Sequence, residues 1–321
     1  MSTTTTTTPP PKVWLITGCS SGFGLALALH VLNAGHKVIA TSRNPSKTPD
    51  LVTQVQNLGG TWLTLDICSP ESELASFIER ATAIHGIIDV LVNNAGYALL
   101  GAFECFSSLN MAKKLTSPTP NASAAECLSI MHTNFLAPLS LTRLLIPSMR
   151  TRRSGTLINI SSTAGIEAKP SRSLYSASKF ALEAFSEALY SELKPFNIRV
   201  LLVEPGAFRT NFADNLVLPE MELPGDYRGS EVEGVLGGVL SMRGEGEGKG
   251  MKGFEGKMGD VAKGAKAIFD VVEGTGWAEG MGEYLRLPLG RDGSERWEVK
   301  LKSLRENLDG TEMIWSRTGE D

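Results

Sequence analysis

The sequence predicts an α/β protein with a single doubly wound parallel β-sheet of about seven strands and helices on both faces. Short β-rich runs alternate with longer segments in which apolar residues recur at spacings of three and four, as βαβ units require. The chain has 321 residues, of which 42% are hydrophobic, so it can bury the core of one large α/β domain. Right-handed helical crossovers between parallel strands then produce the doubly wound sheet.

Each expected strand is a short apolar run between polar or glycine-containing segments. In chain order the expected strands are Val13–Thr17, Lys37–Ser42, Thr61–Asp66, Ile88–Asn93, Gly155–Ser161, Ile198–Glu204 and Tyr284–Leu287. Helical periodicity is found in Leu25–Leu32, Glu71–Ala83, Ala124–Met149 and Ser173–Lys194. The carboxyl ends of the parallel strands should meet at one edge, where ligands bind in open α/β sheets.

Three segments depart from this alternation. Residues 1–11 are rich in Thr and Pro, and we expect them to form a disordered leader. Residues 12–321 should form one domain. Within it, a polar insertion is expected near 106–123, and a Gly-rich lid segment at 225–259 should be mobile or partly disordered.

The composition argues against several classes of function. The formal net charge is −4 and no run of Lys or Arg is present, so we expect no nucleic-acid partner. No window reaches the roughly 18 apolar residues of a membrane span. The four cysteines are scattered and lack a CxxC pair, so we expect no metal site and a reducing, cytoplasmic location.

A glycine-rich turn joins the first strand to the first helix, which is where a dinucleotide phosphate would bind. Glycines let the backbone approach a pyrophosphate, and the N-terminus of the following helix offers free N–H groups. A turn that only connects strand and helix is the alternative. The candidate residues are Gly18, Ser20, Ser21, Gly22, Phe23 and Gly24.

Small and polar residues end the third and fourth strands. Asp66 can accept a hydrogen bond from an adenine amino group, or it can act as a helix N-cap before Pro70. Asn93, Ala95 and Gly96 can let the backbone meet a cofactor at the sheet edge. The alternative for Asn93 is that its side chain ties neighbouring strands together.

The residue after the second strand distinguishes NAD from NADP. An acidic residue there accepts from the ribose 2′-hydroxyl, whereas an arginine accommodates a 2′-phosphate. The sequence has Arg43 and no acidic residue at this strand end, which favours NADP. An ordinary surface arginine is the alternative.

One expected helix carries Tyr175 and Lys179 about a turn apart. An ammonium near a phenol lowers the phenol pKa from about 10, so Tyr175 can donate and accept a proton. Tyr190 and Lys194 have the same spacing, but only Tyr175 follows a serine, Ser162, by thirteen residues at a strand end. We therefore expect the first pair to be catalytic.

In this order, the motifs resemble the short-chain dehydrogenase/reductase family, which has a Rossmann-type sheet. The matching elements are TGCSSGFG at Thr17–Gly24, Asp66, NNAG at Asn93–Gly96, Asn134, Ser162, YSASK at Tyr175–Lys179, and Pro205-Gly206 with Thr210. The resemblance extends from Lys12 to about Leu289. Arg43 and the segment RLPLGRD, which begins at Arg286, make the sequence similar to fungal carbonyl reductases that resemble 17β-hydroxysteroid and retinol dehydrogenases.

The resemblance implies an NADP(H)-dependent oxidoreductase that interconverts a ketone or aldehyde with an alcohol. Tyr175 would protonate the carbonyl oxygen as hydride is delivered, Lys179 would hold the nicotinamide ribose, and Ser162 would orient the carbonyl. Asn134 would position a water that relays protons to Lys179; a buried amide satisfied by backbone is the alternative. A homodimer or homotetramer is the implied assembly. The implied cofactor contacts are Gly18, Ser20, Ser21, Gly22, Phe23, Gly24, Arg43, Asp66, Asn93, Ala95, Gly96, Tyr175, Lys179, Pro205, Gly206 and Thr210.

Two other functions remain open at this point. A non-catalytic NADP-binding regulator can share the fold, and a redox-neutral dehydratase or isomerase can use the same tyrosine. The segment after Gly206 is apolar, which favours a hydrophobic substrate, as in fungal secondary metabolism, unless these residues only pack a lid. They are Phe208, Phe212, Leu216, Val217, Leu218, Met221 and Leu223.

Overall fold

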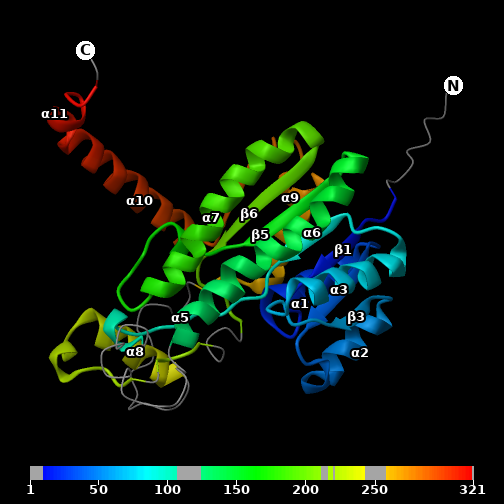
Figure 1. The fold of residues 1–321 in the computed structure, drawn as a ribbon, viewed down its shortest axis with the longest axis horizontal. Coiled ribbons are helices and arrows are strands. Elements are labelled where there is room, and N and C mark those ends of the chain that lie inside the picture. Colours follow the sequence, from blue (N-terminus) through cyan, green and yellow to red (C-terminus); the bar gives the residue numbers. More distant parts are fainter. Residues whose placement is uncertain (1–9, 107–123, 211–215, 220, 243–257, 320–321) are drawn as a thin grey trace.

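The computed structural model describes residues 10–106, 124–210, 216–219, 221–242 and 258–319. Its centre is a seven-stranded sheet with the order β3-β2-β1-β4-β5-β6-β7 (Figure 1). Every neighbouring pair of strands is parallel. The strand order therefore runs outward in both directions from the β1/β4 pair, which confirms the expected doubly wound α/β class.

The strands lie close to their predicted positions. They are β1 (Val13–Ile16), β2 (Lys37–Ser42), β3 (Thr61–Thr64), β4 (Val90–Asn93), β5 (Gly155–Ile160), β6 (Ile198–Pro205) and β7 (Arg286–Leu289). β2 has the predicted bounds, and the other strands differ by one or two residues at their ends. β7 is displaced by two residues because Arg286 is the first residue that pairs with β6.

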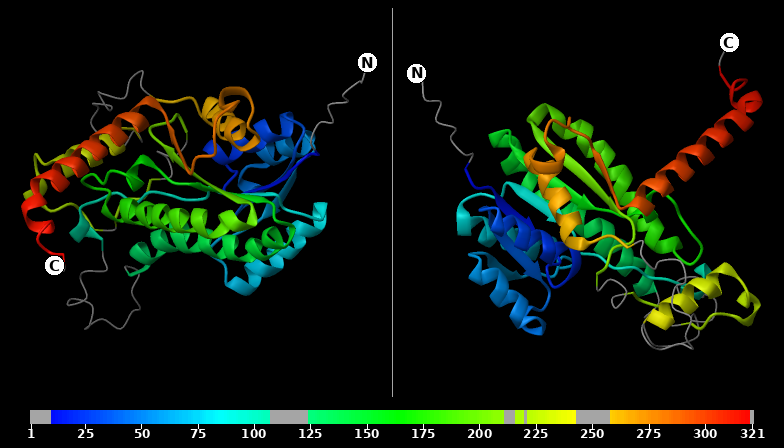
Figure 2. Two further views of the ribbon diagram at one scale, coloured as in Figure 1. Left: turned by 90° about the horizontal axis from the view of Figure 1, so that it is seen from above. Right: turned by 180° about the vertical axis from the view of Figure 1, so that it is seen from behind.

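Helices cover both faces of the sheet (Figure 2). They are α1 (Gly22–Asn33), α2 (Pro49–Asn57), α3 (Glu71–His85), α5 (Ala124–Met131), α6 (Ala137–Arg152), α7 (Ser173–Leu193), α8 (Glu231–Met242), α9 (Val261–Glu273), α10 (Arg291–Gly310) and α11 (Glu312–Trp315). Trp14 and Ile16 of β1 pack under α1 and α9, while Val13 and Leu15 pack under α3, α6 and α7. The side chains of β1 alternate between the two faces of the sheet and therefore contribute to the apolar core on each face.

The predicted helix Ala124–Met149 is interrupted. A π-helical turn at His132–Leu136 separates α5 from α6, and it contains Asn134. Apolar periodicity predicted one continuous helix because the wider turn inserts without breaking the run of apolar residues. Turns of this kind are frequent at functional sites.

Several helices were not predicted from the sequence. α8 lies inside the Gly-rich segment 225–259, so its composition concealed a helix at Glu231–Met242. α9 begins at an N-cap, Asp260, whose Oδ1 accepts from the amides of Ala262 and Lys263. Residues 1–9 of the leader, 107–123 of the insertion and 243–257 of the Gly-rich segment lie outside the described residues.

Helix α10 extends away from the body of the protein, as Figure 1 and the rear view of Figure 2 show. Its first turns remain attached to β7 and to the carboxyl edge of the sheet. Across the described ranges, no helix combines the length and apolar character needed to cross a membrane.

Candidate active site

The glycine turn folds tightly against the end of β4. Gly18 has a φ of +71°, and a Cβ on it would lie 2.9 Å from Ala95 Cα. A Cβ on Gly24 would lie 2.5 Å from the carbonyl oxygen of Gly18. The conformation of the turn therefore requires glycine at both positions, independently of any ligand. This confirms that the two glycines serve to join β1 to α1.

The same turn fits a dinucleotide phosphate. The first intrahelical bond of α1 runs from the Leu25 N–H to the Ser21 carbonyl, and the Ser21 side chain caps no amide. The N–H groups of Gly22, Phe23 and Gly24 consequently have no acceptor within the helix. Amides at a helix N-terminus attract a phosphate through hydrogen bonds and the helix dipole.

The two asparagines after β4 have different tasks. Asn93 Nδ2 is buried and donates to Asn159 Oδ1 at 2.8 Å and to Thr142 Oγ1 at 3.2 Å. The strand-tying alternative is thus confirmed for the Asn93 side chain, and the approach of the backbone at Asn93 to a cofactor stays a prediction.

Asn94 was missed by the sequence reasoning. Its Nδ2 donates to the carbonyls of Thr17 at 2.8 Å and Gly18 at 3.1 Å, and its N–H donates to Thr17 Oγ1 at 2.9 Å. Asn94 therefore clamps the glycine turn onto β4. The second asparagine of the NNAG motif was the signal that could have revealed it.

Asp66 and Arg43 lie exposed beyond β3 and β2. Asp66 Oδ1 accepts from the Cys68 N–H at 2.9 Å, whereas the N-cap of α3 is Pro70. The N-cap alternative for Asp66 is therefore wrong, since its carboxylate closes a local turn instead. Arg43 follows β2 directly, as predicted, and is exposed at the sheet edge.

Tyr175 lies in the first turn of α7, against the turn that follows β5. Burial raises the pKa of the Tyr175 phenol, while a hydrogen bond with Ser162 and the Arg172 guanidinium lower it. The predicted net fall of this pKa near Lys179 is wrong for this arrangement, because burial outweighs the charges around the phenol, and Lys179 Nζ lies 6.0 Å from the ring centroid. The phenol is therefore protonated at neutral pH, as a proton donor must be.

Lys179 lies one turn further along α7 and is 6% exposed. Its Nζ donates to the Ile160 carbonyl at 2.8 Å. Burial lowers the pKa of Lys179 to about 8, and the nearby Glu183 carboxylate opposes this fall. A Cβ on Gly96 would lie 3.8 Å from Lys179 Nζ and 3.0 Å from Asn134 Oδ1, so the three residues meet at one point.

The Asn134 side chain is fully engaged inside the protein. Its Nδ2 donates to the Tyr97 carbonyl at 2.9 Å and to Ser178 Oγ at 3.0 Å, and its Oδ1 accepts from the Tyr97 N–H at 3.1 Å. The alternative of a buried, satisfied amide is therefore confirmed for this side chain. Its location beside Gly96 and Lys179 nevertheless makes it part of the wall of the site.

The second Tyr-x-x-x-Lys pair lies elsewhere. Tyr190 packs against the apolar cluster beneath α3, α6 and α7. Fifteen residues of helix separate it from Tyr175, which is about 22 Å at 1.5 Å per residue. The prediction that Tyr190 packs away from the Ser162 turn is confirmed.

The segment after β6 crosses over the glycine turn. A Cβ on Gly22 would lie 3.6 Å from Thr210 Cβ, so Thr210 lies beside the expected phosphate site. The Ala207 N–H donates to Asp292 Oδ2 at 2.8 Å, and a Cβ on Gly206 would collide with the Asp292 carboxylate. Asp292, at the start of α10, therefore holds this covering segment, and no motif predicted that role.

The apolar residues after Gly206 differ in what they pack against. Phe208 packs edge-on against Phe23 of the glycine turn, with ring centroids 4.9 Å apart. Leu216 belongs to a buried cluster that includes Tyr175. Phe212 lies outside the described residues.

A cavity of about 390 Å³ adjoins the Tyr175 cluster. Its lining is mostly apolar and includes Leu218, Met221 and Leu223 from the predicted apolar set, together with Leu236 of α8. Leu218 and Leu236 also pack against the cluster that contains Tyr175. Part of the predicted apolar segment therefore lines a space where an apolar ligand can fit.

Comparisons with known proteins agree with this geometry. A family model described as short chain dehydrogenase matches residues 12–220. Oxidoreductase claN of Passalora fulva is 46% identical over 200 residues, which cover 62% of this chain and 83% of that protein. Human retinol dehydrogenase 8 is 37% identical over 219 residues, covering 66% of this chain and 64% of its own.

Solved structures have the same architecture. A short-chain dehydrogenase from Streptomyces avermitilis has a TM-score of 0.78 at 33% identity, over 98% of this chain and 100% of its own. A metagenomic short-chain oxidoreductase in complex with NADP has a TM-score of 0.52 at 30% identity, over 62% of this chain and 83% of its own. The chain belongs to the short-chain dehydrogenase/reductase family and is an oxidoreductase of that family.

Proposed function

We propose that this oxidoreductase uses NADP(H) to interconvert a ketone or aldehyde with an alcohol on a hydrophobic substrate. The observation that carries the proposal is the meeting of Tyr175, Ser162 and Lys179 at the carboxyl edge of the sheet. When bound there, the nicotinamide supplies hydride to the carbonyl carbon or accepts it from the alcohol. The protein then has to orient the carbonyl and provide a proton.

The proton comes from the Tyr175 phenol, which burial keeps protonated. Ser162 shares a hydrogen bond with Tyr175 and can orient the carbonyl oxygen toward the phenol. Lys179, held by the Ile160 carbonyl, provides the positive charge that stabilises the phenolate left after proton transfer. In the alcohol-oxidation direction the same groups act in reverse order.

The cofactor preference rests on the edge formed by β1, β2 and β4. The amides of Gly22, Phe23 and Gly24 would bind the pyrophosphate. Arg43 would pair with the 2′-phosphate through a charge-assisted hydrogen bond. The NADP complex of the metagenomic relative supports this choice of dinucleotide.

Other cofactor contacts follow from the resemblance and from proximity. Ala95 and Gly96 would let the backbone approach the nicotinamide ribose, while Pro205, Gly206 and Thr210 would cover the nicotinamide. Asp66 would reach the adenine. Ser20, Ser21 and Gly18 would complete the phosphate turn.

The substrate class is suggested by the cavity that adjoins the apolar cluster containing Tyr175. Its 390 Å³ and largely apolar wall suit a hydrophobic carbonyl compound, such as a secondary metabolite. Glu222 and Glu233 are the charged residues of its lining, so an anionic substrate would be repelled. The location and assembly are also part of the proposal. The four cysteines are free, which supports a cytoplasmic location. A homodimer or homotetramer is the assembly that the resemblance suggests.

The proposal is tested by following NADPH consumption with a panel of apolar ketones and aldehydes. Tyr175→Phe should keep NADPH binding and the thermal unfolding temperature, but lose about 10²-fold or more in turnover, as expected for removal of a general acid. Tyr190→Phe is the matched control and should remain within a few-fold of wild type.

Three results would contradict the proposal. NADPH binding without consumption of any carbonyl compound would indicate a non-catalytic regulator. Conversion of a substrate without net redox would indicate a dehydratase or isomerase. Near wild-type carbonyl reduction by Tyr175→Phe would show that another group donates the proton.

A further inference from the structure

A buried charge cluster lies directly behind the catalytic turn. Glu183 follows Lys179 by four residues on α7, so both side chains lie on one face of the helix. Glu183 is 4% exposed. A Cβ on Gly165 would lie 2.9 Å from both Cγ and Oε1 of Glu183 and 2.9 Å from Ser161 Oγ. Glu183 therefore supports the turn that begins with Ser162.

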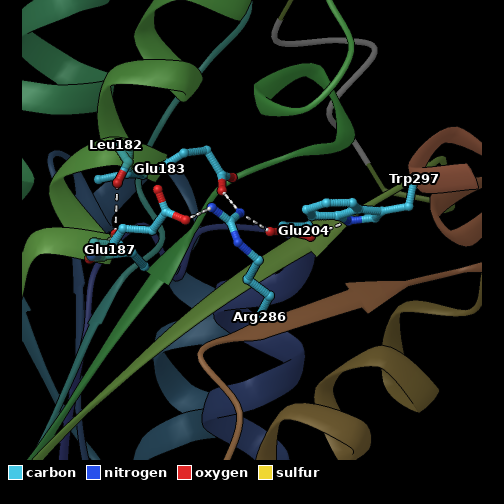
Figure 3. Close-up of polar contacts among 8 residues, drawn as sticks. Leu182, Glu183, Glu187, Glu204, Arg286 and Trp297 are labelled. Carbon is cyan, nitrogen blue, oxygen red and sulfur yellow. Dashed lines mark hydrogen bonds and ion pairs between the residues drawn. The ribbon is translucent and has the colours of Figure 1, made fainter. Parts of the chain in front are cut away.

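The Glu183 carboxylate is paired with Arg286 of β7 (Figure 3). The same guanidinium binds Glu204 Oε1 of β6 at 2.7 Å and Glu187 Oε1 of α7 at 3.0 Å. Glu204 is fully buried, and its Oε2 accepts from Trp297 Nε1 of α10 at 2.6 Å. Four elements of the fold thus converge on Arg286.

The charges of the cluster balance only when Lys179 is included. Glu183 and Glu204 are two buried carboxylates, whereas Arg286 supplies one positive charge. Glu187 adds a third carboxylate, but its side chain is 59% exposed and solvent screens it. When Glu183 and Glu204 are both ionised, the ammonium of Lys179 is the second cation beside Arg286, and it brings these four groups to neutrality.

We propose that Glu183 is a positioning residue for Lys179, which keeps the buried lysine as an ammonium beside Tyr175. This inference rests on the proposed function, because it assigns Glu183 a role in the same catalytic step. Arg286 holds the Glu183 carboxylate in place, so the C-terminal strand β7 takes part in setting the charge of the site. Glu183 itself contacts neither substrate nor cofactor in this scheme.

The protonation states of the two residues are linked. Burial lowers the pKa of Lys179 to about 8, and the Glu183 carboxylate opposes that fall. Burial and the Glu204 carboxylate raise the pKa of Glu183 to about 8, while Ser161 and Arg286 lower it. A proton therefore leaves Lys179 in the pH range where the ionisation of Glu183 also changes. Removing the Glu183 charge should lower the pKa of Lys179, because a carboxylate favours the nearby ammonium.

Among the described residues, the charged and titratable groups around Lys179 and Glu183 are Tyr175 and Glu187 of α7, Glu204 of β6 and Arg286 of β7. The uncharged Trp297 approaches from α10. None of them is altered by Glu183→Gln, which preserves the size of the side chain and can still accept from Arg286. The variant thus removes one charge with little change in shape.

The first measurement needs no substrate. Protein containing lysine labelled with ¹³C at Cε is titrated by NMR, and the Lys179 resonance is assigned by its loss in Lys179→Arg. Glu183→Gln should lower the Lys179 pKa by about one unit, the lower end of the effect of a nearby opposite charge. Glu187→Gln, one turn further along α7 and exposed, should change it by less than about 0.3 unit.

The second measurement is the pH profile of kcat/KM for carbonyl reduction. Its alkaline limb should move to lower pH by the same amount in Glu183→Gln, since the ammonium is lost at lower pH, and should stay in place in Glu187→Gln. A residue that only supports the fold would lower the unfolding temperature without moving this limb. Should Glu183→Gln fail to fold, Glu183→Asp replaces it, because the shorter side chain withdraws the carboxylate from Lys179. A Lys179 pKa below that of the wild type then supports the inference, and an unchanged pKa overturns it.

The two measurements distinguish a failure of the proposed role of Glu183 from a failure of the proposed function. An unchanged Lys179 pKa in a folded Glu183→Gln protein overturns the role of Glu183, whatever the enzyme reduces. A lowered Lys179 pKa with an unmoved kinetic limb supports the coupling but contradicts the proposed function of Lys179 in turnover.

Discussion

Asn93→Ala should destabilise the protein strongly, although the residue lies at the edge where a cofactor would bind. The Asn93 amide is 4% exposed and supplies the donor for Asn159 Oδ1 and for Thr142 Oγ1. Asn159 is fully buried, and its own Nδ2 donates to Ser186 Oγ of α7 at 2.8 Å. The substitution leaves a buried acceptor on Asn159 without its donor.

An unsatisfied buried acceptor costs about 1–3 kcal/mol, and the lost bond to Thr142 adds to it, so the free energy of unfolding should fall by about 2–4 kcal/mol. For a domain of this size that lowers the unfolding temperature by about 3–6 °C. Thermal unfolding followed by circular dichroism measures this directly. Asn307→Ala is the control, because Asn307 is exposed on α10 and donates only to the Ser303 carbonyl within its own helix. Equal unfolding temperatures for Asn93→Ala and wild type would refute the inter-strand role.

Two further predictions concern the cofactor and the wall of the site. Wild-type protein should bind NADPH at least about tenfold more tightly than NADH, and Arg43→Ala should narrow that difference, because the 2′-phosphate loses its charged partner. Equal affinity of the wild type for both dinucleotides in a fluorescence titration would contradict the NADP assignment. Gly96→Ala should reduce turnover, since the new Cβ would lie 3.0 Å from Asn134 Oδ1, which three hydrogen bonds hold in place. Gly234→Ala, with no atom within 4 Å of the added Cβ, is its control and should retain wild-type turnover.

The sequence was sufficient to predict the sheet and the residues that line its edge. The strand runs are apolar because both faces of the sheet are covered, and glycine or asparagine marks where each relevant strand ends. The separation of Tyr190 from Tyr175 was also predictable, since the rise per residue of one helix determines it.

Tertiary contacts account for what the sequence could not predict. The hydrogen bonds of Asn94 to Thr17 and Gly18 depend on how β1 and β4 lie together, which no local pattern reveals. The π turn around Asn134 keeps helical periodicity, so apolar spacing cannot reveal it. The pKa of Tyr175 was expected to fall near Lys179, but it rises because burial of the phenol outweighs the charges around it.

The part of the chain beyond residue 220 completes a site that the family motif only begins. The family model ends at residue 220, and yet Arg286 and Asp292 both support the site from further along the chain. Without Arg286, the buried carboxylates of Glu183 and Glu204 would have Lys179 as their remaining cation in the described cluster, and uncompensated buried charge costs several kcal/mol. Protonating Glu183 would relieve that cost, but it would also remove the charge that stabilises the Lys179 ammonium. Substitution of Arg286 in β7 should therefore change the pH range of activity while the Tyr-x-x-x-Lys motif itself stays intact.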